Sequence, residues 1–427
     1  MPTFRIEGRH PLSGAVRASG NKNAALPILA AALLVDAPVR IHNLPRIGDV
    51  ETMLQLLSHL GAAVTWLNDH AVEINAANLQ RRPLDAELCR KARGSILLLA
   101  PLLHRFGRAE MPFPGGDRIG RRRIDTHLLA LEALGARIEV GANIRVSISS
   151  GITGADILLD EASVTATENT VMAAVLGRGA TIIQNAACEP HVQELCRFLK
   201  SMGADIAGIG TNELQVNGVK RLHGADVTLG ADYIEVASFI ALAAVTGSEI
   251  IIKEASPENL RMILHQFRRL GVDVETQGDD IFVPRHQRLE IQTDYRSAIP
   301  KIDDAPWPGF PADLTSVATV LATQCRGSII IFEKMFESRM FFVDQLIEMG
   351  AQIVLCDPHR AVVIGPARLH GARMTSPDIR AGMALLIASL CADGVSSIGN
   401  INQIDRGYER IDERLRALGA HIQRVPD

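Results

Sequence analysis

Apolar and polar positions follow a pattern that occurs six times along this 427-residue chain. In each copy an amphipathic segment ends in Leu or Met, then glycine, then Ala or Val, and an alternating apolar and polar segment follows. Glycine with a positive φ angle is the usual residue directly after a helix. Each copy therefore predicts a helix, a sharp stop and a strand. The six glycines, spaced 68 to 79 residues apart, are Gly61, Gly135, Gly203, Gly271, Gly350 and Gly419.

A second helix and strand precede each of these helices. The segment is rich in Ala and Leu on all sides, which is typical of a helix buried inside its domain, and a turn and a β-branched strand follow it. A period near 70 residues is too long for a solenoid repeat, so we expect six βαβ-type units in two α/β domains, with a boundary near 230–231. The predicted buried helices are 24–34, 96–104, 170–176, 236–244, 317–324 and 383–390. The strands that follow them are 39–44, 110–113, 181–185, 249–253, 328–332 and 395–398.

Composition narrows the class of protein. Hydrophobic residues make up 47% and charged residues 22% of the chain, as in ordinary globular proteins. The net charge is −4, so no overall positive field favours nucleic acid as a partner. No apolar run reaches the roughly 18 residues that span a bilayer, and the N-terminus has no signal region. We therefore expect a cytoplasmic protein whose partners are neither nucleic acid nor a membrane.

The cysteines give no sign of a metal site or a disulfide framework. Six are scattered along the chain without CxxC spacing, and free, buried thiols in a reducing compartment are the expected state. Nothing in the sequence indicates a cofactor. The cysteines are Cys89, Cys188, Cys196, Cys325, Cys356 and Cys391.

The segment 114–127 has the most concentrated chemistry in the sequence. It begins Pro-Gly-Gly-Asp and presents Asp117, four arginines, Asp125 and His127 within fourteen residues. Glycine lets backbone N–H groups approach an anion closely. Such a loop suits a phosphate-bearing substrate and an acid that moves a proton, although a solvated, charged surface loop has the same composition.

The starts of the buried helices are the other informative places. Thr165 and Glu168 have the spacing of a capping box, and helix capping also accounts for Asp313 and Asp378 without any catalytic role. Cations at a helix N-terminus oppose the helix dipole. Lys22, Arg93 and Arg380 therefore need anionic partners, and a ligand is one candidate.

Three motifs, in the same order, resemble the UDP-N-acetylglucosamine 1-carboxyvinyltransferase family. They are Ser-Gly-Asn-Lys-Asn-Ala-Ala-Leu-Pro at 19–27, the 114–127 loop, and Ile-Asp-Arg-Gly-Tyr-Glu-Arg at 404–410. The resemblance covers essentially the whole chain. It implies the two-domain enolpyruvyl transferase fold, an inverse α/β barrel with six βαβαββ-type repeats, three in each domain. It also implies a discontinuous first domain of 1–21 and 231–427, and an inserted second domain of 22–230 that carries the glycine-rich loop 114–123.

The family's chemistry transfers the enolpyruvyl group of phosphoenolpyruvate to the 3-hydroxyl of UDP-N-acetylglucosamine and releases phosphate, which begins peptidoglycan synthesis. By resemblance, the catalytic residues are Asp117, Lys22, Asp313 (as the base) and Arg406. The residues implied to bind phosphoenolpyruvate are Lys22, Asn23, Arg122, Arg380 and Arg406. Those implied to bind the UDP-sugar are Asn23, Arg93, Arg122, Arg123, Ile124, Asp125, Thr126, His127, Glu161, Ser163, Val164, Asp313, Met335, Phe336 and Arg339.

The chain departs from the family pattern in three places. The family's commonest loop has cysteine as proton donor where this chain has Asp117, and members with aspartate escape fosfomycin, an epoxide that alkylates the thiol. Many members have lysine at the position of Glu161. The segment 299–307, ahead of the suggested base, is longer than usual.

Three alternatives remain. The first is an enolpyruvyl transferase that acts on another uridine nucleotide, such as UMP. The second is an inactive nucleotide-binding relative, which the presence of Lys22 and Arg406 disfavours. The third, the shikimate-pathway synthase, shares the fold, but its Lys-Ser and Asn-Ala-Gly-Thr motifs are missing. No Gly-x-x-x-x-Gly-Lys-[Ser/Thr] stretch supports an ATP-using enzyme.

Overall fold

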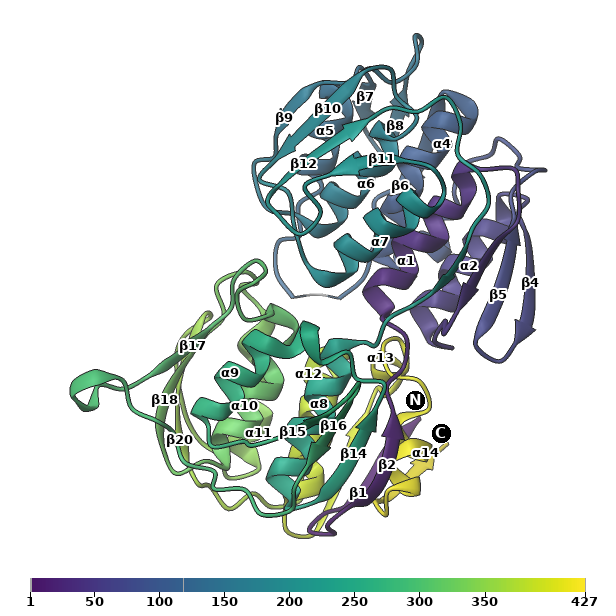
Figure 1. Cartoon of the computed structure of the whole chain (residues 1–427). Coiled ribbons are helices and arrows are strands. Elements are labelled where there is room, and N and C mark those ends of the chain that lie inside the picture. Colours follow the sequence, from purple (N-terminus) through teal and green to yellow (C-terminus); the bar gives the residue numbers. More distant parts are fainter. Residues whose placement is uncertain (1, 118, 427) are drawn as a thin grey trace. The chain divides into compact units, whose positions relative to one another are not determined.

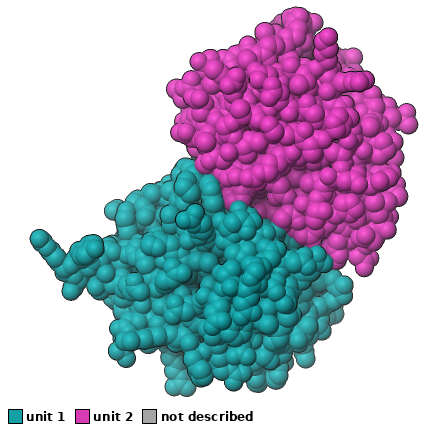
Figure 2. All heavy atoms as spheres, viewed as in Figure 1, with its two compact units in different colours: residues 1–19, 118–122, 231–427 teal, residues 20–117, 123–230 magenta. Residues whose placement is uncertain are grey.

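The structure, a computed structural model, describes residues 2–117 and 119–426. The chain divides into two compact units, which are coloured separately in Figure 2. Unit 1 comprises 1–19, 118–122 and 231–427, and unit 2 comprises 20–117 and 123–230. The breaks near residues 20 and 230 lie beside the domain limits expected from the sequence.

Unit 1 contains three four-stranded sheets around a group of helices (Figure 1). The first sheet has the order β21 (Arg373–Thr375), β22 (Val395–Gly399), β1 (Thr3–Glu7), β23 (His421–Val425). The second has the order β15 (Glu275–Gln277), β16 (Asp280–Val283), β14 (Glu249–Lys253), β2 (Ser13–Arg17). The third has the order β17 (Lys301–Asp303), β18 (Gly327–Phe332), β20 (Arg360–Gly365), β19 (Gln352–Asp357).

The helices of unit 1 fall into an inner and an outer set. The inner helices α8, α10 and α12 contact one another, and every residue of α10 and α12 is buried. A helix that is apolar on all sides is stable only in such an interior, which is why these segments form the core. The helices are α8 (Tyr233–Thr246), α9 (Arg261–Arg269), α10 (Thr315–Thr323), α11 (Val343–Glu348), α12 (Ile379–Cys391), α13 (Asn402–Asp405) and α14 (Ile411–Ala417).

Unit 2 repeats this plan with inner helices α1, α4 and α6. Its first sheet has the order β13 (Asp226–Thr228), β3 (Val39–His42), β5 (Ala71–Asn75), β4 (Ala63–Asn68). The second has the order β11 (Asp205–Ala207), β12 (Glu213–Asn217), β10 (Ala180–Gln184), β9 (Asp156–Leu158). The third, with three strands, has the order β6 (Arg108–Pro112), β8 (Asn143–Ser147), β7 (Arg137–Val140). Its helices are α1 (Lys22–Ala31), α2 (Gly48–His59), α3 (Ala86–Lys91), α4 (Leu99–Phe106), α5 (Asp125–Ala133), α6 (Val164–Ala174) and α7 (Pro190–Ser201).

The mixed α/β arrangement with inner helices and outer sheets confirms the predicted fold class. The described strands form six separate sheets and do not close into a continuous barrel. Parallel and antiparallel pairs occur in the same sheet: β14, for example, is parallel to β2 and antiparallel to β16.

All six predicted helix stops are present. Each of the six glycines has a positive φ angle, between 83° at Gly271 and 103° at Gly419. In the first copy the Gly61 N–H donates to the Ser58 carbonyl and the Ala62 N–H donates to the Leu57 carbonyl. This pair of bonds is the Schellman motif, which satisfies the last carbonyls of the helix. The same two bonds follow α5, α7, α9, α11 and α14.

The tip of the glycine-rich loop differs from the expectation. It was expected to belong to the second domain, but the described residues 119–122 belong to unit 1. The physical reason is a set of hydrogen bonds: the Arg121 N–H donates to the Glu337 carboxylate at 3.0 Å, and the Ser338 N–H donates to the Ile119 carbonyl at 3.1 Å.

Two further sequence expectations can be compared with the structure. All six cysteines are free thiols and four are buried, but Cys188 is partly exposed and Cys356 is exposed. Every described helix is too short or too polar to cross a lipid bilayer.

Candidate active site

The inner helices α8, α10 and α12 of unit 1 each begin near an aspartate. Asp232 and Asp378 are N-caps whose carboxylates accept backbone N–H groups at the starts of α8 and α12. Asp313 is different. It lies in the short 3-10 helix η5 (Ala312–Leu314) before α10, and Leu314, the N-cap of α10, makes no side-chain capping bond. The capping role expected for Asp313 is therefore wrong, and its carboxylate has other partners.

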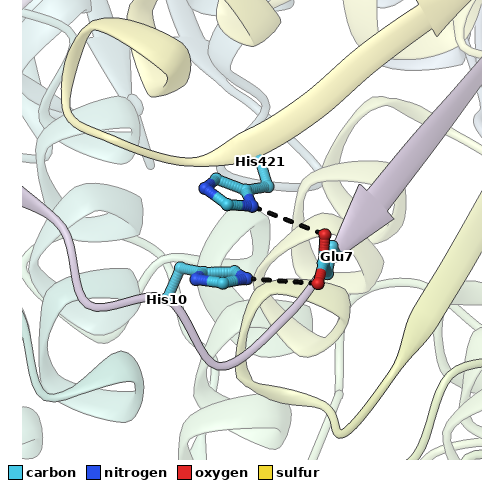
Figure 3. A group of neighbouring side chains, drawn as sticks. All are labelled: Glu7, His10 and His421. Atoms are coloured by element: carbon cyan, nitrogen blue, oxygen red, sulfur yellow. Dashed lines mark hydrogen bonds and ion pairs between the residues drawn. The ribbon is translucent and has the colours of Figure 1, made fainter.

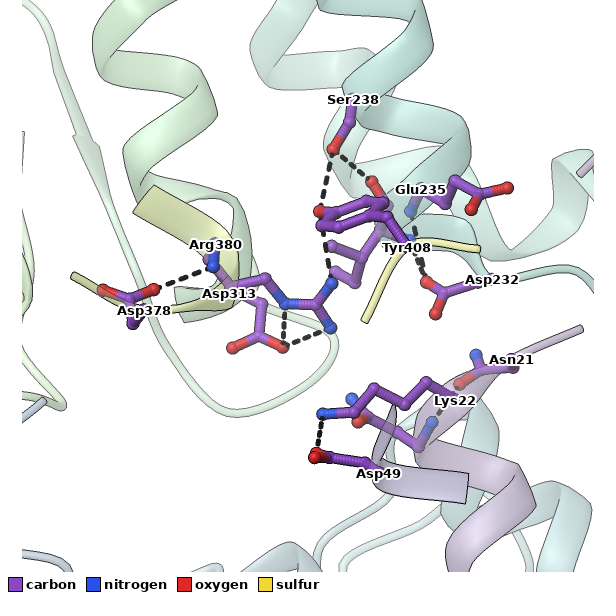
Figure 4. Close-up of polar contacts among 12 residues, drawn as sticks. Asn21, Lys22, Asp49, Asp232, Glu235, Ser238, Asp313, Asp378, Arg380 and Tyr408 are labelled. Atoms are coloured by element: carbon purple, nitrogen blue, oxygen red, sulfur yellow. Dashed lines mark hydrogen bonds and ion pairs between the residues drawn. The ribbon is translucent and has the colours of Figure 1, made fainter. Parts of the chain in front are cut away.

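The Asp313 carboxylate lies between two guanidinium groups (Figure 4 shows its contact with Arg380). Arg339 Nη2 donates to Oδ1 at 3.1 Å, and Arg380 Nε donates to Oδ2 at 3.0 Å. Both arginine side chains are 5% exposed or less, whereas the Asp313 side chain is 29% exposed. The solvent-accessible part of this cluster is thus an anionic oxygen pair supported by two buried cations.

Arg380 is fixed from its other side by Tyr408 and Ser238. Arg380 Nη1 donates to the Tyr408 hydroxyl at 3.2 Å, and that fully buried hydroxyl lies 3.5 Å from Ser238 Oγ. Burial lowers the pKa of Arg380, but the nearby Asp313 and Tyr408 outweigh burial and raise the pKa well above its usual value. The anionic partner that this cation needs at the start of α12 is supplied by the chain itself.

A second carboxyl group, Glu333, lies behind Arg339 and is completely buried. Its Oε2 is 3.7 Å from Arg339 Nε, too far for a hydrogen bond, and neither atom has a hydrogen-bond partner in the structure. Burial raises the pKa of Glu333 to about 8; Arg339 opposes the rise and Asp304 adds to it. A neutral Glu333 leaves Asp313 as the main counter-charge of Arg339.

Two carboxyl groups hold the turn that presents Met335 and Phe336. Asp304, which is buried, accepts the N–H groups of Lys334 and Met335. Glu333 accepts the Phe336 N–H at 3.2 Å. The turn is thereby fixed with the Met335 side chain 40% exposed. Met335 and Phe336 were predicted from the sequence, whereas the two acids that position them were not.

In unit 2, Lys22 is the first residue of α1 and pairs with Asp49 at the start of α2 (Figure 4). Lys22 Nζ lies 2.9 Å from Asp49 Oδ2, and the two side chains are 11% and 7% exposed. The N-cap of α1 is Asn21, whose side-chain oxygen accepts the N–H groups of Asn23 and Ala24. Asp49 lies in an amphipathic segment and belongs to no motif, so this pair could not be predicted from the sequence.

Most residues expected at the UDP-sugar come together at the N-terminal ends of α5 and α6. Arg93 Nη2 donates to the Arg123 carbonyl at 2.8 Å. Arg123 contacts both Asp125 and Asp160, and the Thr126 hydroxyl donates to Asp160 at 2.6 Å. Asp160, which the sequence analysis did not select, is the anchor that joins these segments. The neighbouring residues expected at the same substrate are Ile124, Glu161, Ser163 and Val164.

His127 is buried and both of its ring nitrogens have protein partners. Asn169 Nδ2 lies 3.1 Å from Nδ1, and Thr165 Oγ1 lies 3.0 Å from Nε2. Because the amide NH₂ of Asn169 only donates, Nδ1 accepts and Nε2 carries the proton. Burial lowers the pKa of His127 to about 3, and Arg93 adds to the effect. His127 is therefore a neutral group that joins α5 to α6.

The capping box expected at 165–168 is wrong. The N-cap of α6 is Ser163, whose hydroxyl accepts the Ala166 N–H, and the helix begins six residues earlier than the apolar pattern indicated. Glu168 is fully buried in α6, and its Oε1 has no hydrogen-bond partner among the residues that the structure describes. Burial, with a smaller contribution from Glu189, raises its pKa well above the usual value.

The remaining expected residues lie on loops and helix ends. Arg406 is the C-cap residue directly after α13 and donates to Gln403 Oε1 at 2.7 Å. Arg122 and Asp117 are partly buried residues of the glycine-rich loop. Their roles, and those of the other site residues, stay predictions.

Comparison with known proteins shows the family to which the chain belongs. Residues 6–415 match the family model described as EPSP synthase (3-phosphoshikimate 1-carboxyvinyltransferase). The UDP-N-acetylglucosamine 1-carboxyvinyltransferase of Bradyrhizobium diazoefficiens is 56% identical over 424 residues, which cover 99% of this chain and 98% of that protein. The chain belongs to the UDP-N-acetylglucosamine 1-carboxyvinyltransferase family of enolpyruvyl transferases. The enzyme of the same name from Treponema denticola is 51% identical and is covered over 99% of both chains.

Two solved structures have the same fold as this enolpyruvyl transferase. The enolpyruvyl transferase NikO from Streptomyces tendae superposes with a TM-score of 0.87 at 26% identity, covering 100% of this chain and 99% of that one. EPSP synthase from Acinetobacter baumannii superposes with a TM-score of 0.77 at 16% identity over the full length of both chains, which shows the fold alone.

The buried Glu333 makes a pH-dependence prediction. The folded protein keeps the Glu333 proton up to about pH 8, whereas the unfolded chain releases it near 4.5. Folding thus takes up a proton between these values. This contribution to stability is complete below pH 4.5 and is lost as the pH rises toward 8. The side chain of Glu333→Gln is neutral at every pH. Across this pH range, the free energy of unfolding of the variant is therefore expected to fall by on the order of a few kcal/mol less than that of the wild type.

Urea unfolding midpoints of the wild type and of Glu333→Gln, measured from pH 4.5 to pH 8, test this prediction. Glu258→Gln, which neutralises an exposed glutamate of the same unit, is the matched control and should follow the wild-type profile. Parallel pH profiles for the wild type and Glu333→Gln would show that Glu333 is already ionised at pH 5.

Proposed function

We propose that the protein transfers the enolpyruvyl group of phosphoenolpyruvate to the 3-hydroxyl of UDP-N-acetylglucosamine and releases inorganic phosphate, the first committed step of peptidoglycan synthesis. The observation that carries the proposal is the match along the whole chain to relatives with this name, at 56% and 51% identity. The Asp313 cluster supports the proposal because it supplies the charges that such a reaction needs.

Phosphoenolpyruvate carries a phosphate and a carboxylate, so its binding needs cations. In unit 1 we assign Arg380 and Arg406, with Arg122 of the glycine-rich loop, and in unit 2 Lys22 beside Asn23. Lys22 and Arg380 are already held by Asp49 and Asp313. Buried, oriented cations act on developing negative charge without the cost of reorganising at the moment of reaction.

Asp313 is the proposed base. Its carboxylate is the accessible part of a cluster whose cations are buried, and a base must reach the proton that it removes. The two arginines orient the carboxylate but also reduce its basicity. When the anionic groups of phosphoenolpyruvate bind Arg380, they compete with Asp313 for that cation, and the carboxylate becomes a better proton acceptor.

The transfer has two steps with balanced protons. In the first, the sugar 3-oxygen bonds to C2 of phosphoenolpyruvate, Asp313 takes the hydroxyl proton, and Asp117 gives a proton to the CH₂ carbon. In the second, the C2–O bond to phosphate breaks and the phosphate leaves with the proton held by Asp313. The new CH₃ group returns a proton to the Asp117 carboxylate, and the double bond is restored. Asp117 is our proposed donor because it occupies the position of the family's loop cysteine.

The UDP-sugar is assigned to the ends of α5 and α6 and to the Met335 turn. Arg93 and Arg123 provide cations for the diphosphate, and helix N-termini favour anions. Phe336 packs against Arg339, whose guanidinium lies 4.9 Å from the ring centroid, so this turn is coupled to the Asp313 cluster. Glu161, where many family members have lysine, is the position at which acceptor recognition would differ.

Phosphate release with different acceptors tests the proposed function. Purified protein should release phosphate from phosphoenolpyruvate only when UDP-N-acetylglucosamine is present. UMP and shikimate 3-phosphate are offered separately as the competing acceptors. Faster release with UMP would identify another uridine nucleotide as the acceptor, release with shikimate 3-phosphate would favour the shikimate-pathway reaction, and no release with any of the three would identify an inactive relative.

The aspartate at position 117 makes a separate prediction. A carboxylate is a poor nucleophile toward an epoxide compared with a thiolate, so the wild type should keep full activity in fosfomycin. Asp117→Cys should become sensitive and gain one covalent adduct at residue 117. Mass spectrometry of digested protein locates the adduct, and the exposed native Cys356 serves as an internal control that should stay unmodified.

Asp117→Ala completes this experiment because it provides neither a thiol nor an acid. It should remain unmodified, stay folded and lose most of its turnover. An adduct on Asp117 of the wild type would refute the proposed basis of resistance. Unchanged turnover in Asp117→Ala would exclude Asp117 as the proton donor.

A further inference from the structure

Two histidines and a glutamate that the proposed reaction does not use lie together on the outer surface of unit 1 (Figure 3). Glu7 ends the first strand, β1, His421 begins the last strand, β23, and His10 follows β1 in the chain. His10 Nε2 lies 3.6 Å from Glu7 Oε1, and His421 Nδ1 lies 3.4 Å from Glu7 Oε2. One nitrogen or oxygen from each residue lies within 4.8 Å of the other two.

The backbone holds these three side chains in place. Glu7 and His421 are direct partners in the antiparallel pairing of β1 with β23, so their side chains leave the sheet on one face. The turn that brings His10 back is fixed at Gly8, where an added Cβ would lie 2.2 Å from the Ala392 carbonyl oxygen. The next residue, Arg9, has a φ angle of 65° and donates to Asp393 at 2.8 Å.

The histidine rings lie face to face with centroids 3.7 Å apart and an interplanar angle of 25°. Figure 3 shows that the nitrogens facing Glu7 lie on the same side of both rings. Their contacts with the glutamate, from His421 first and then His10, lower the pKa of Glu7. The group therefore offers one anionic oxygen and two imidazole nitrogens that point toward a common region.

We propose that Glu7, His10 and His421 form a surface binding site for a divalent transition-metal ion of the zinc type. Zinc binds imidazole nitrogen and carboxylate oxygen at about 2.0–2.2 Å in a tetrahedron, which places neighbouring ligand atoms about 3.3–3.5 Å apart. The structure has separations close to this size: 3.4 Å from His421 Nδ1 to Glu7 Oε2, and 3.6 Å from His10 Nε2 to the other carboxylate oxygen, Oε1. A small rotation of the two rings would aim both nitrogens at one ion.

The ligand set also determines which ions are excluded. Imidazole nitrogen suits zinc, copper and nickel, whereas magnesium and calcium prefer all-oxygen surroundings. Three protein ligands leave one tetrahedral position for water, so binding should be reversible. A bound ion would join β1 to β23 and thereby tie the first strand of the chain to the last. Because a ligand that binds only the folded state stabilises it, zinc should raise the unfolding temperature.

Calorimetric titration of the full-length protein with zinc chloride, in the absence of substrates, tests the proposal. We expect one zinc ion per chain and a higher unfolding temperature with zinc. His10→Gln and His421→Gln should each weaken zinc binding by more than about tenfold, because each removes one ligand, and the double variant should lose both binding and the temperature rise. Magnesium chloride should produce neither effect.

Two matched variants exclude other sources of zinc binding. His286→Gln removes an exposed histidine of the same unit outside the cluster, and Cys356→Ser removes the exposed thiol. Both should bind zinc like the wild type. Failure of the wild type to bind, wild-type affinity in the double variant, or loss of binding in Cys356→Ser would each overturn the proposal. None of the proposed catalytic residues is changed, so the outcome is independent of the phosphate-release experiment.

Discussion

The contact on which this account depends is the Asp313 carboxylate held between the guanidinium groups of Arg339 and Arg380. Burying a cation without a counter-charge costs several kcal/mol or more, and the two arginines share this one accessible acid. The inner helices α10 and α12 make the contact possible, because they are apolar on all sides and bring their N-terminal ends to the same part of unit 1.

The same principle recurs at other cations. Lys22 is paired with Asp49 in unit 2, and Arg414 is paired with the buried Glu235 at 2.8 Å in unit 1. A cation at a helix start needs an anion to balance it, and a ligand is one candidate for that anion. For Lys22 and Arg380 the structure supplies a carboxylate from the chain itself. An anionic substrate then has to compete with that carboxylate, and this competition is how our proposal links phosphoenolpyruvate binding to the basicity of Asp313.

Periodicity predicted the fold well because it depends on local physics. The glycine stops, the inner helices and most strands follow from hydrophobic spacing and from the need for a positive φ angle after a helix, and the predicted strand 249–253 agrees with the structure to the residue. The sheet pairing of β1 and β2 with strands near the C-terminus is a long-range property that the repeats alone did not indicate.

The site was predicted less completely. The motifs carried by the resemblance named the cations, but the acids that position them lie in segments without any motif, as Asp49, Asp160 and Glu333 show. The capping box at 165–168 failed for a related reason: the Thr-x-x-Glu spacing does not reveal that the Glu168 side chain is fully buried. Partners that are distant in sequence cannot be read from local spacing.

The turnover of Asp313→Asn with both substrates at saturation is the most direct test of the central claim. Asparagine keeps the size of the side chain but cannot take a proton. We expect the variant to fold, because the neutral Glu333, 3.7 Å from Arg339, can ionise and replace the lost charge. Turnover should fall by about 10²–10⁴-fold, the usual contribution of a general base, while UDP-N-acetylglucosamine still binds. Turnover within about tenfold of the wild type, well short of that contribution, would contradict the account.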